Sequence, residues 1–323
     1  MVRALSEAEV HDILDLSALV PVVGEALEKQ AAGAVERPER PHYPVGAGLE
    51  GADPLGTGIA MPAYIHGDDC YATKLVGIHE GNADRELPTI HAQIVLSNAR
   101  TGVPEAFLAG TTITNARTGC IGALAVRELA SGPVTLGVLG AGAQARWQTR
   151  AIDTVATLED VRIYSPSDSR VECAADLDEE GIPARAVDSS AAAVEDADVV
   201  VTATTATEPV FPAEALAPGA LVVAIGAFTA EMQELEPAVL ERAARVFADV
   251  PDEVAGTGDI LATDLDAGDL VPMGQMLTEG YERASPDDIL VVDSVGSATM
   301  DAAASTAIYD AAVDADTGTD VSL

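Results

Sequence analysis

The sequence predicts an α/β protein in which a doubly wound parallel sheet of the Rossmann type is joined to a second, α+β domain. A run rich in β-forming residues at 134–139 meets a glycine turn at 140–145, and a helical pattern follows over residues 146–158. Beyond that point, short β-type runs alternate with helical segments, which is the order expected of a doubly wound sheet. With 323 residues, the chain is long enough for about two domains.

The part of the chain before the glycine turn predicts a mixed domain. Residues 1–35 have helical periodicity, with Ser6 and Glu9 at capping-box spacing, and residues 36–70 are rich in Pro and Gly and read as loops with strands. Short β-type runs follow at 71–78, 89–96 and 105–108. Turn residues separate these runs, so we expect one mostly antiparallel sheet. A helix predicted over residues 115–131 leads into the glycine turn.

The part of the chain after the glycine turn alternates between strands and helices. Strands are predicted at 161–165, 184–187, 198–203, 221–225, 245–248 and 289–293. Helices are predicted at 167–179 and 189–197. A last helix over residues 297–313 follows the final strand and can cross back to the first domain, and the polar tail 314–323 is expected to fray.

The balance of charge is strongly acidic. The chain holds 53 Asp and Glu against 17 Lys and Arg, a formal charge of −36, while 48% of its residues are hydrophobic. The acids are spread over the whole chain, which indicates a solvated negative surface and argues against nucleic acid as a partner. Only Lys29 and Lys74 are lysines. Because many acids with few lysines are typical of proteins that work in concentrated salt, where screening suppresses self-repulsion, we expect a halophilic source.

Cysteine usage and hydropathy favour a cytoplasmic protein. Cys70, Cys120 and Cys173 are not closely paired, which fits a reducing compartment and neither a disulfide framework nor a metal site. No apolar run approaches the roughly 18 residues of a membrane span. The first ten residues do not read as a signal peptide. We therefore expect no metal and no membrane partner.

The glycine turn predicts a nucleotide site. Gly140 permits the tight turn, Gly142 lets the backbone approach a pyrophosphate closely, and small Ala145 takes the place of a third glycine where the helix packs on the strand. The pyrophosphate would lie at the helix N-terminus, beside Ala143 and Gln144, where N–H groups and the helix dipole favour anions. S-adenosylmethionine, which also binds at glycine turns after a first strand, is the alternative ligand.

The residues after the second strand of this unit bear on the choice of dinucleotide. An acid at this place normally binds the ribose hydroxyls of NAD, but residues 165–170 here read SPSDSR. Ser165, Ser167 and Arg170 can accept the extra phosphate of NADP, while Asp168 can still bind the ribose hydroxyls of NAD. NAD and NADP both stay open as cofactors, with a slight preference for NADP.

Three cationic residues are the candidates for catalysis and substrate binding. Lys74 is retained in a lysine-poor chain and lies in the alternating strand pattern 71–77, so its ammonium can point into a cleft. A buried lysine loses its charge more readily than an arginine and can exchange protons near neutral pH. Arg40 lies in a Pro-flanked loop, and Arg117 lies near the beginning of the helix before the glycine turn. Because Arg binds carboxylates through two hydrogen bonds, the three cations together can hold a small carboxylate.

Other catalytic motifs have little support. The histidines have no metal-binding spacing, and a structural role is expected for each, although His91 lies in a strand near the proposed cleft. They are His11, His42, His66, His79 and His91. No Gly-x-Ser-x-Gly pattern, Walker motif or carboxylate pair stands out, which argues against hydrolases and kinases.

Several motifs resemble, in the same order, those of the ornithine cyclodeaminase and μ-crystallin family over nearly the whole chain. The motifs are Pro38-Glu39-Arg40, Met61-Pro62-Ala63, Thr73-Lys74-Leu75-Val76, TITNART at residues 112–118, the glycine turn at 140–145, Ile225-Gly226-Ala227 with Glu234-Leu235, and Asp293-Ser294-Val295-Gly296. Each match is weak by itself, and their common order makes the set specific.

The resemblance implies a homodimer of two-domain chains. Residues 1–117 with 297–323 would form the substrate-binding and dimerisation domain, and residues 118–296 would form the Rossmann domain. Arg40, Lys74 and Arg117 would hold the substrate carboxylate near Met61, with Lys74 also a candidate proton relay. To the glycine turn, the resemblance adds the cofactor contacts Thr118, Thr202, Thr204, Val295 and Gly296.

The resemblance also implies NAD(P)-dependent hydride transfer at an α-carbon that bears nitrogen. The family covers ornithine cyclodeaminase, an archaeal-type alanine dehydrogenase and reductases of ketimines such as pyrroline-2-carboxylate. In the cyclodeaminases an aspartate follows the glycine pair after the fifth strand and handles the ornithine side-chain amine, whereas Phe228 stands at that place here. A phenyl ring does not pair with an ammonium as a carboxylate does, so we expect a small or cyclic apolar amino or imino acid in contact with Phe228. Two alternatives are ornithine cyclisation, with Glu231 or another acid as a substitute, and non-catalytic binding of NADPH and a ligand as in μ-crystallin.

Overall fold

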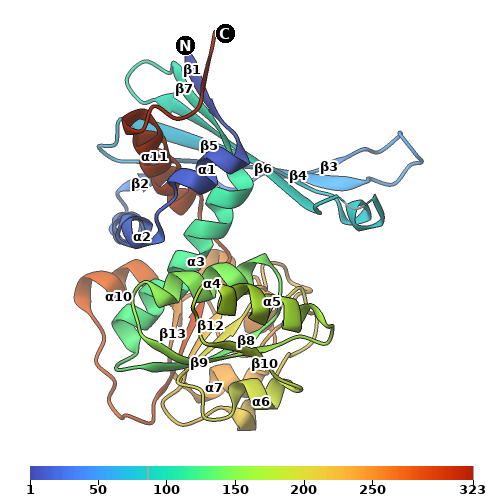
Figure 1. The fold of residues 1–323 in the computed structure, drawn as a ribbon, viewed down its shortest axis with the longest axis vertical. Helices are drawn as coiled ribbons and strands as arrows, with labels where there is room; N and C mark the ends of the chain where they lie inside the picture. The colour runs from blue at the N-terminus through green and yellow to red at the C-terminus, as the bar shows by residue number, and fades with distance from the viewer. Residues whose placement is uncertain (86, 323) are drawn as a thin grey trace. The chain divides into compact units, whose positions relative to one another are not determined.

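The computed structural model describes residues 1–85 and 87–322, and the chain divides into two compact units (Figure 1). The first unit comprises Met1–Arg117 and Ala298–Leu323, and the second comprises Thr118–Ser297. By this division Ser297, which the sequence analysis assigned to the first domain, belongs to the second unit. Each unit is built on a sheet of its own.

The first unit contains a mostly antiparallel sheet, as the sequence predicts. Its strands are β1 (Val2–Leu5), β2 (Val35–Glu36), β3 (His42–Val45), β4 (Gly56–Ile65), β5 (Cys70–Ile78), β6 (Ile90–Asn98), β7 (Pro104–Ala109) and β16 (Thr319–Val321). They lie in the order β16-β1-β7-β6-β5-β4-β2, with β3 paired to β4. Strands β1 and β7 are parallel, and the other neighbours are antiparallel.

Helices pack on one face of this sheet. They are α1 (Glu7–Ile13), α2 (Leu16–Ala31) and α11 (Ala298–Asp314), and α11 contacts β4, β5 and α2. A short 3₁₀ helix, η1 (Glu80–Arg85), precedes β6. Side chains alternate across the sheet, so Ile94 and Leu108 are buried while Phe107, next to Leu108, is 40% exposed. Helix α3 (Gly110–Leu129) begins in this unit and continues into the second.

Two expectations about the ends of the chain are wrong. Residues 2–5 form strand β1 rather than part of a helix, because they pair with β7 and with β16. Helix α1 begins only after Ser6, which forms a capping box with Glu9. Residues 319–321 of the C-terminal tail do not fray, since β16 pairs with β1 and Asp320 lies 3.3 Å from Arg3. Pairing between distant segments thus overrides the local pattern at both ends.

The second unit contains a parallel sheet. Its strands are β8 (Val134–Leu139), β9 (Leu158–Tyr164), β10 (Ala184–Ala186), β11 (Val199–Thr202), β12 (Leu221–Ala224), β13 (Ala243–Ala248), β14 (Val271–Pro272) and β15 (Ile289–Asp293). They lie in the order β10-β9-β8-β11-β12-β15-β13-β14. The strand order changes direction between β8 and β11, and open α/β sheets bind their ligands at such a switch point. This arrangement confirms the predicted fold class.

Helices lie on both sides of the parallel sheet. They are α4 (Ala143–Asp153), α5 (Ser169–Glu179), α6 (Ser190–Val194), α7 (Pro237–Arg242), α8 (Pro251–Val254), α9 (Gly258–Leu261) and α10 (Met273–Glu279), with a 3₁₀ helix, η2 (Ala213–Ala215). In Figure 1, α4 and α5 lie on one side of the sheet, and α6 and α7 lie on the other. Helix α4 ends at Asp153, five residues before the predicted end, because Leu158 already pairs with Val134 as the first residue of β9.

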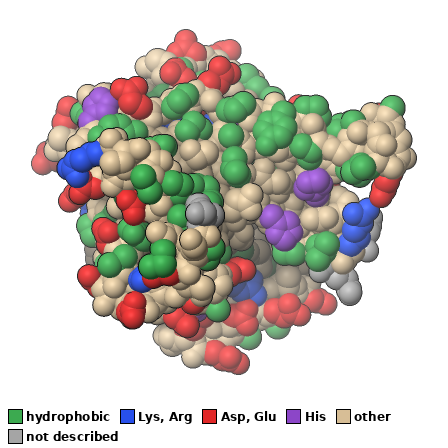
Figure 2. All heavy atoms as spheres, turned by 90° about the horizontal axis from the view of Figure 1, so that it is seen from above, with side chains coloured by type: hydrophobic (Ala, Val, Ile, Leu, Met, Phe, Trp, Pro, Cys, Tyr) green, Lys and Arg blue, Asp and Glu red, His purple; other side chains and the backbone are tan. Residues whose placement is uncertain are grey.

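The surface is strongly acidic. Figure 2 shows Asp and Glu side chains distributed around the face of the molecule, with few Lys and Arg among them. Several arginines form ion pairs with acids, such as Arg150 with Glu180 at 2.5 Å and Arg185 with Asp160 at 2.8 Å. Within residues 1–85 and 87–322, no helix combines the length and apolar character needed to cross a bilayer.

Candidate functional site

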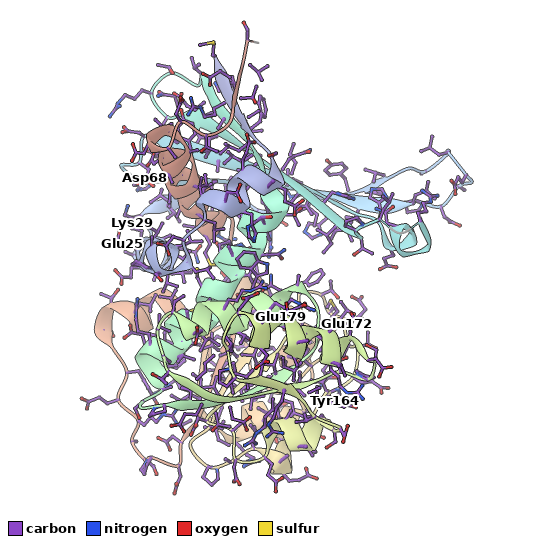
Figure 3. The ribbon with its side chains drawn as sticks, in the orientation of Figure 1. Glu25, Lys29, Asp68, Tyr164, Glu172 and Glu179 are labelled. Atoms are coloured by element: carbon purple, nitrogen blue, oxygen red, sulfur yellow. The ribbon has the colours of Figure 1, made fainter. Side chains whose placement is uncertain are left out.

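The first candidate site is a buried cluster of charges in the first unit, centred on Lys74. Lys74 lies in β5, where its Cα pairs with Met61 of β4 on one side and with Ile94 of β6 on the other. The residue is only 2% exposed, whereas the other lysine, Lys29, pairs with Asp68 at 3.2 Å near the surface (Figure 3). Because an isolated buried charge is very costly, the Lys74 ammonium requires close partners.

Those partners come from two helices. Asp301 of α11 places Oδ2 2.7 Å from Lys74 Nζ, and its Oδ1 accepts a hydrogen bond from Arg117 Nε at 2.8 Å. Arg117 is buried in α3, and Asp301 is 1% exposed. Lys74 Nζ also donates to Thr114 Oγ1 at 3.4 Å, one turn of α3 before Arg117. One aspartate therefore holds an ammonium and a guanidinium together.

Burial and charge shift the pKa values within this cluster. Burial lowers the pKa of Lys74 to about 8; Asp301 opposes this shift, and the positive charges of Arg117 and Arg40 add to it. Burial alone would raise the pKa of Asp301, but Arg117 and Lys74 outweigh burial and lower it. Near neutral pH the cluster therefore holds an ionised carboxylate beside an ammonium that can readily give up its proton.

Arg40 and Met61, the other predicted substrate residues of this unit, lie around Lys74. Arg40 lies between β2 and β3, is half-buried, and acts on the pKa of Lys74 through its charge. Met61 is buried across the sheet from Lys74. Three cations with one carboxylate make the cluster positive, which suits an anionic substrate in an otherwise acidic chain.

Asp301 was not among the site residues predicted from the sequence. A signal was present, because Asp301 is an acid within the small and apolar stretch 298–305 of the last helix. A buried acid needs a partner, and the lysine and arginines of the first domain were the candidates. Its partner was still not predictable, since the packing of α11 against β5 joins residues that lie more than 200 positions apart in the sequence.

The second candidate site is the glycine turn at the carboxyl end of β8, in the second unit. Gly140 has a φ of +114°, and a Cβ there would lie 2.4 Å from the carbonyl oxygen of Ala203, so only glycine fits. Gly142 precedes α4, and a Cβ at this position would meet nothing within 4 Å. Ala143 and Gln144 form the first turn of α4. Because Gly142 has no side chain that could cap the helix, a pyrophosphate fits at this N-terminus.

Side chains of α4 fix the turn and the helix before it. Arg146 Nη1 donates to the carbonyl oxygen of Ala141 at 2.7 Å, and the same guanidinium lies 2.5 Å from Asp176 of α5. Gln148 Nε2 donates to the carbonyl oxygen of Thr118 at 2.8 Å. Thr118, a predicted cofactor contact, is buried in α3 within this unit.

The loop after β9 gathers serine hydroxyls around a guanidinium. Ser165 Oγ lies 3.2 Å from Ser167 Oγ and 3.0 Å from Ser169 Oγ. Arg170 Nη1 donates to the carbonyl oxygen of Ser167 at 2.7 Å. The side chain of Asp168 is 98% exposed and lies 3.7 Å from Arg170. Hydroxyls beside a guanidinium suit a phosphate group.

A buried carboxylate joins the loops after β11 and β12. Glu234 Oε1 accepts hydrogen bonds from the N–H and Oγ1 of Thr204 at 2.6 and 2.7 Å. Its Oε2 accepts from Thr202 Oγ1 at 2.8 Å and from the N–H of Gly226 at 2.7 Å. Burial raises the pKa of Glu234 to about 6, and these hydrogen bonds oppose the rise. The predicted cofactor contacts Thr202 and Thr204 are thus fixed by an acid to which the sequence analysis gave no role.

A second buried carboxylate fixes the loop after β15. Asp249 Oδ2 accepts hydrogen bonds from Ser294 Oγ at 2.7 Å and from the N–H of Gly296 at 2.8 Å, and Oδ1 accepts from the N–H of Val295 at 3.2 Å. Gly296 has a φ of +82°. Asp293, the last residue of β15, is buried, and burial followed by three neighbouring carboxylates raises its pKa well above the ordinary value. Across residues 1–85 and 87–322, no group of three or more His, Cys, Asp or Glu could hold a metal ion.

Phe228 follows β12 in a loop of the second unit. Its side chain is 45% exposed. Glu231, the acid considered as a substitute for the missing aspartate, is exposed in the same loop. This loop therefore presents an apolar ring at the position where the resemblance to the cyclodeaminases implied a carboxylate.

A Rossmann unit with an open glycine turn, combined with a unit that buries a cationic cluster, defines a two-domain protein of the dinucleotide-binding class. Comparison with known proteins makes this assignment more specific. The chain belongs to the ornithine cyclodeaminase/mu-crystallin family, whose model matches residues 1–316. The resemblance drawn from the sequence motifs is thereby confirmed.

Relatives with assigned activities match almost the full chain. The Delta(1)-pyrroline-2-carboxylate/Delta(1)-piperideine-2-carboxylate reductase of Azospirillum brasilense is 34% identical over 323 residues, which cover 95% of this chain and 97% of the relative. The Delta(1)-pyrroline-2-carboxylate reductase 1 of Burkholderia multivorans is 32% identical over 327 residues, again covering 95% and 97%.

Solved structures share the same architecture. The Thermococcus litoralis Delta(1)-pyrroline-2-carboxylate reductase, in complex with NADH and L-proline, superposes with a TM-score of 0.91 at 26% identity and covers 99% of this chain and 100% of its own. An archaeal alanine dehydrogenase dimer with bound NAD superposes with a TM-score of 0.88 at 26% identity and covers 100% and 99%.

Proposed function

We propose that this protein is an NAD(P)-dependent reductase of small cyclic imino acids such as Delta(1)-pyrroline-2-carboxylate. The relatives named as reductases of this compound support the reaction, and the similar structure solved with NADH and L-proline supports both cofactor and product. The observation that carries the proposal on this chain is the buried cluster of Lys74, Arg117 and Asp301.

The charges of the cluster assign a role to each residue. Arg117 and Arg40 bind the substrate carboxylate through guanidinium N–H groups, and Met61 lines the same site. A bound nicotinamide dinucleotide supplies the hydride. Lys74 donates a proton to the imine nitrogen, and a pKa of about 8 suits this transfer near neutral pH.

The dinucleotide would bind along the carboxyl ends of the parallel strands. Gly140, Gly142, Ala143 and Gln144 would hold the pyrophosphate at the N-terminus of α4. Thr118, Thr202 and Thr204 would line the groove, with Val295 and Gly296 near the nicotinamide. The neighbours solved with NADH and NAD support this class of cofactor.

The loop after β9 supports a slight preference for NADP. Ser165 and Arg170 offer a hydroxyl and a guanidinium to a 2′-phosphate, while the carboxylate of Asp168 is turned to solvent. Titration of the protein with NADH and NADPH, followed by the fluorescence of the reduced nicotinamide, measures this preference directly. A lower dissociation constant for NADH would overturn it.

Alanine dehydrogenase is the second candidate, since the NAD-bound neighbour of that name covers the whole chain. It needs the same carboxylate site and differs in using an open-chain imine. Ornithine cyclodeamination has less support, because Phe228 replaces the aspartate and Glu231 is exposed. Non-catalytic ligand binding has less support as well, because Arg40, Lys74 and Arg117 are all retained.

A spectrophotometric screen in concentrated salt separates these functions. It follows NADH and NADPH with Delta(1)-pyrroline-2-carboxylate, with pyruvate plus ammonia, and with ornithine. Oxidation of the cofactor with the cyclic imine supports the proposal, and preference for pyruvate plus ammonia supports alanine dehydrogenase. Ammonia release from ornithine without net change in NADH supports the cyclodeaminase, and cofactor binding without turnover supports a binding protein.

The first unit supports a homodimer. Phe107 and Leu75 are exposed on the sheet face opposite the helices, where a partner could cover them. A second copy of the chain is the partner we propose for this face, in agreement with the dimeric alanine dehydrogenase neighbour. Sedimentation velocity in concentrated salt tests it, and a monomer at micromolar concentration would contradict it.

We also propose a cytoplasmic protein adapted to concentrated salt. The free cysteines Cys70, Cys120 and Cys173 fit a reducing compartment. The formal charge of −36 and the two lysines support the salt adaptation.

A further inference from the structure

The Lys74 cluster contains one residue that the substrate-binding roles leave unexplained. Lys74 and Arg117 would repel each other in a buried site, and both are needed near the substrate. Asp301 lies between them, with one carboxylate oxygen 2.7 Å from Lys74 Nζ and the other 2.8 Å from Arg117 Nε. It reaches them from α11, at the opposite end of the chain from β5.

We propose that Asp301 is a positioning residue for imine reduction, which holds the Lys74 ammonium protonated and in place while it anchors Arg117 through Nε. This inference rests on the proposed function. A guanidinium has five N–H donors in a planar fork, so a single bond through Nε fixes its orientation and leaves the fork for a carboxylate. Asp301 thus sets the geometry of both the proton donor and the carboxylate clamp.

The charge of Asp301 does not change during the reaction. In the reduction, the hydride adds to the imine carbon and the π pair of the C=N bond moves to nitrogen. The nitrogen takes a proton from Lys74, and a solvent proton then restores the ammonium. Asp301 stays ionised throughout, because Arg117 and Lys74 outweigh its burial and keep the pKa of its carboxyl low.

Among the described residues, charges on three elements act on the Lys74 ammonium. Asp301 acts from α11, Arg117 from α3, and Arg40 from the segment between β2 and β3. Asp301 favours the protonated form of Lys74, whereas both arginines and burial disfavour it. Neutralising Asp301 should therefore make Lys74 give up its proton at a lower pH.

The test is the pH dependence of kcat/KM for Asp301→Asn in both directions of the reaction. For imine reduction, we expect the wild-type rate to fall above about pH 8, where Lys74 loses its proton, and the variant rate to fall roughly one pH unit lower or more. For L-proline oxidation, which needs neutral Lys74, the rising limb should move to lower pH by the same amount. KM for the imino acid should also rise by about tenfold, because Arg117 loses its anchor.

Asp310→Asn is the matched control. Asp310 is an exposed acid on the same helix, so this variant makes the same chemical change without touching the cluster, and both limbs should keep their wild-type positions. If the pH profiles of kcat/KM for Asp301→Asn keep their wild-type positions in both directions of the reaction, the proposal is overturned. An inactive wild-type protein would instead refute the proposed function, so the two failures are distinguishable.

Asp301→Glu is the second variant, and it decides the question if Asp301→Asn does not fold. It keeps the charge and displaces it by one methylene, so the limbs should stay near their wild-type positions while kcat falls by about tenfold or more. Wild-type kcat in Asp301→Glu would show that the placement of the carboxylate does not matter, which contradicts a positioning role. NADH titration of each variant confirms that the second unit is intact.

Discussion

Lys74 shows how far a single residue can be interpreted from the sequence alone. The scarcity of lysine and the strand alternation were enough to predict a lysine turned toward a cleft, and the structure buries it. The contact of Asp301 with Lys74 was not predictable, because it depends on how the last helix packs across β5. Local pattern gives the direction of a side chain within an element, and tertiary packing alone gives its partner.

Replacing Lys74 with Met should abolish turnover and leave cofactor binding intact. Loss of the proton donor is expected to lower kcat by about 10²- to 10⁴-fold. The dissociation constant of NADH should stay within about twofold, since Lys74 belongs to the first unit and the glycine turn to the second. Initial rates and NADH titration measure the two effects. Lys29→Met is the control. Lys29 forms its ion pair with Asp68 near the surface, so this variant should keep the wild-type rate.

Replacing Gly142 with Val should block the dinucleotide without disturbing the fold. A Cβ at Gly142 meets no protein atom within 4 Å, so the added side chain occupies space that the pyrophosphate would use. We expect the dissociation constant of NADH to rise about a hundredfold or more, or roughly 2.7 kcal/mol, with little change in Tm. Gly81→Val, at a glycine with similarly open surroundings, is the control. An unchanged cofactor titration in Gly142→Val would disprove the role of the turn.

At the scale of elements, the sequence predicted the strands of the parallel sheet better than the loops between them. Runs such as 199–201 and 289–292 are continuously apolar, as buried parallel strands are. The loops after them are fixed by Glu234 and Asp249, which accept hydrogen bonds from residues up to 47 positions away. No local pattern predicts such contacts. The short edge strand β16 was missed for the same reason, since it exists through its pairing with β1.

Replacing Glu234 with Ala should loosen the loops after β11 and β12. The change leaves Thr202, Thr204 and Gly226 without their acceptor, and each unpaired buried donor costs about 1–3 kcal/mol. We expect the free energy of unfolding to fall by at least about 3 kcal/mol and NADH binding to weaken by about tenfold. Chemical denaturation and NADH titration provide the measurements.

Glu236→Ala is the control for Glu234→Ala. Glu236 lies two residues further along the chain and accepts a hydrogen bond from the N–H of Ala213 at 2.9 Å. Loss of this bond should cost about 1 kcal/mol and leave cofactor affinity unchanged. Equal losses of stability and affinity in the two variants would contradict the role of Glu234.

The gain in the free energy of unfolding from Asp293→Asn, relative to wild type, should grow as the pH rises. The pKa of Asp293 is raised in the folded state, so above its ordinary value of about 3.9 the unfolded chain is ionised while the folded one keeps its proton. Folding then takes up a proton, and wild-type stability falls relative to Asp293→Asn by about 1.4 kcal/mol per pH unit until the folded pKa is reached.

Denaturation of wild type and Asp293→Asn at several pH values between about 5 and 8 measures this effect. Exposed Asp287→Asn is the control, and its difference from wild type should not grow with pH. A constant difference for Asp293→Asn would show that the carboxyl ionises normally in the folded protein.

At the scale of the whole molecule, the acid excess is the property that the sequence states most directly. The chain of 323 residues has a formal charge of −36, so its acidic side chains repel one another. At about 1 M salt the screening length falls to roughly 3 Å, which suppresses this repulsion. Composition therefore predicts the dependence of the fold on salt, while it says nothing about which acids are buried. Asp249, Asp293 and Glu234 are buried acids whose roles only the structure reveals.

The fold should melt at a lower temperature in dilute buffer than in molar KCl. We expect Tm to drop by at least about 5 °C on removal of salt, as repulsion between exposed carboxylates is restored. Scanning calorimetry measures the change, with sucrose at equal osmolality as the uncharged control. A Tm that is independent of KCl would contradict salt adaptation.

The most direct test of the central claim is the initial rate of Delta(1)-pyrroline-2-carboxylate reduction in concentrated salt, measured as loss of the absorbance of NADH or NADPH. Reduction by the wild-type protein, with a kcat in the usual range of about 1–10³ s⁻¹, and its disappearance in Lys74→Met is the result we predict. A protein that binds the dinucleotide yet leaves this imine and pyruvate plus ammonia unreduced would contradict the assignment of an imine reductase.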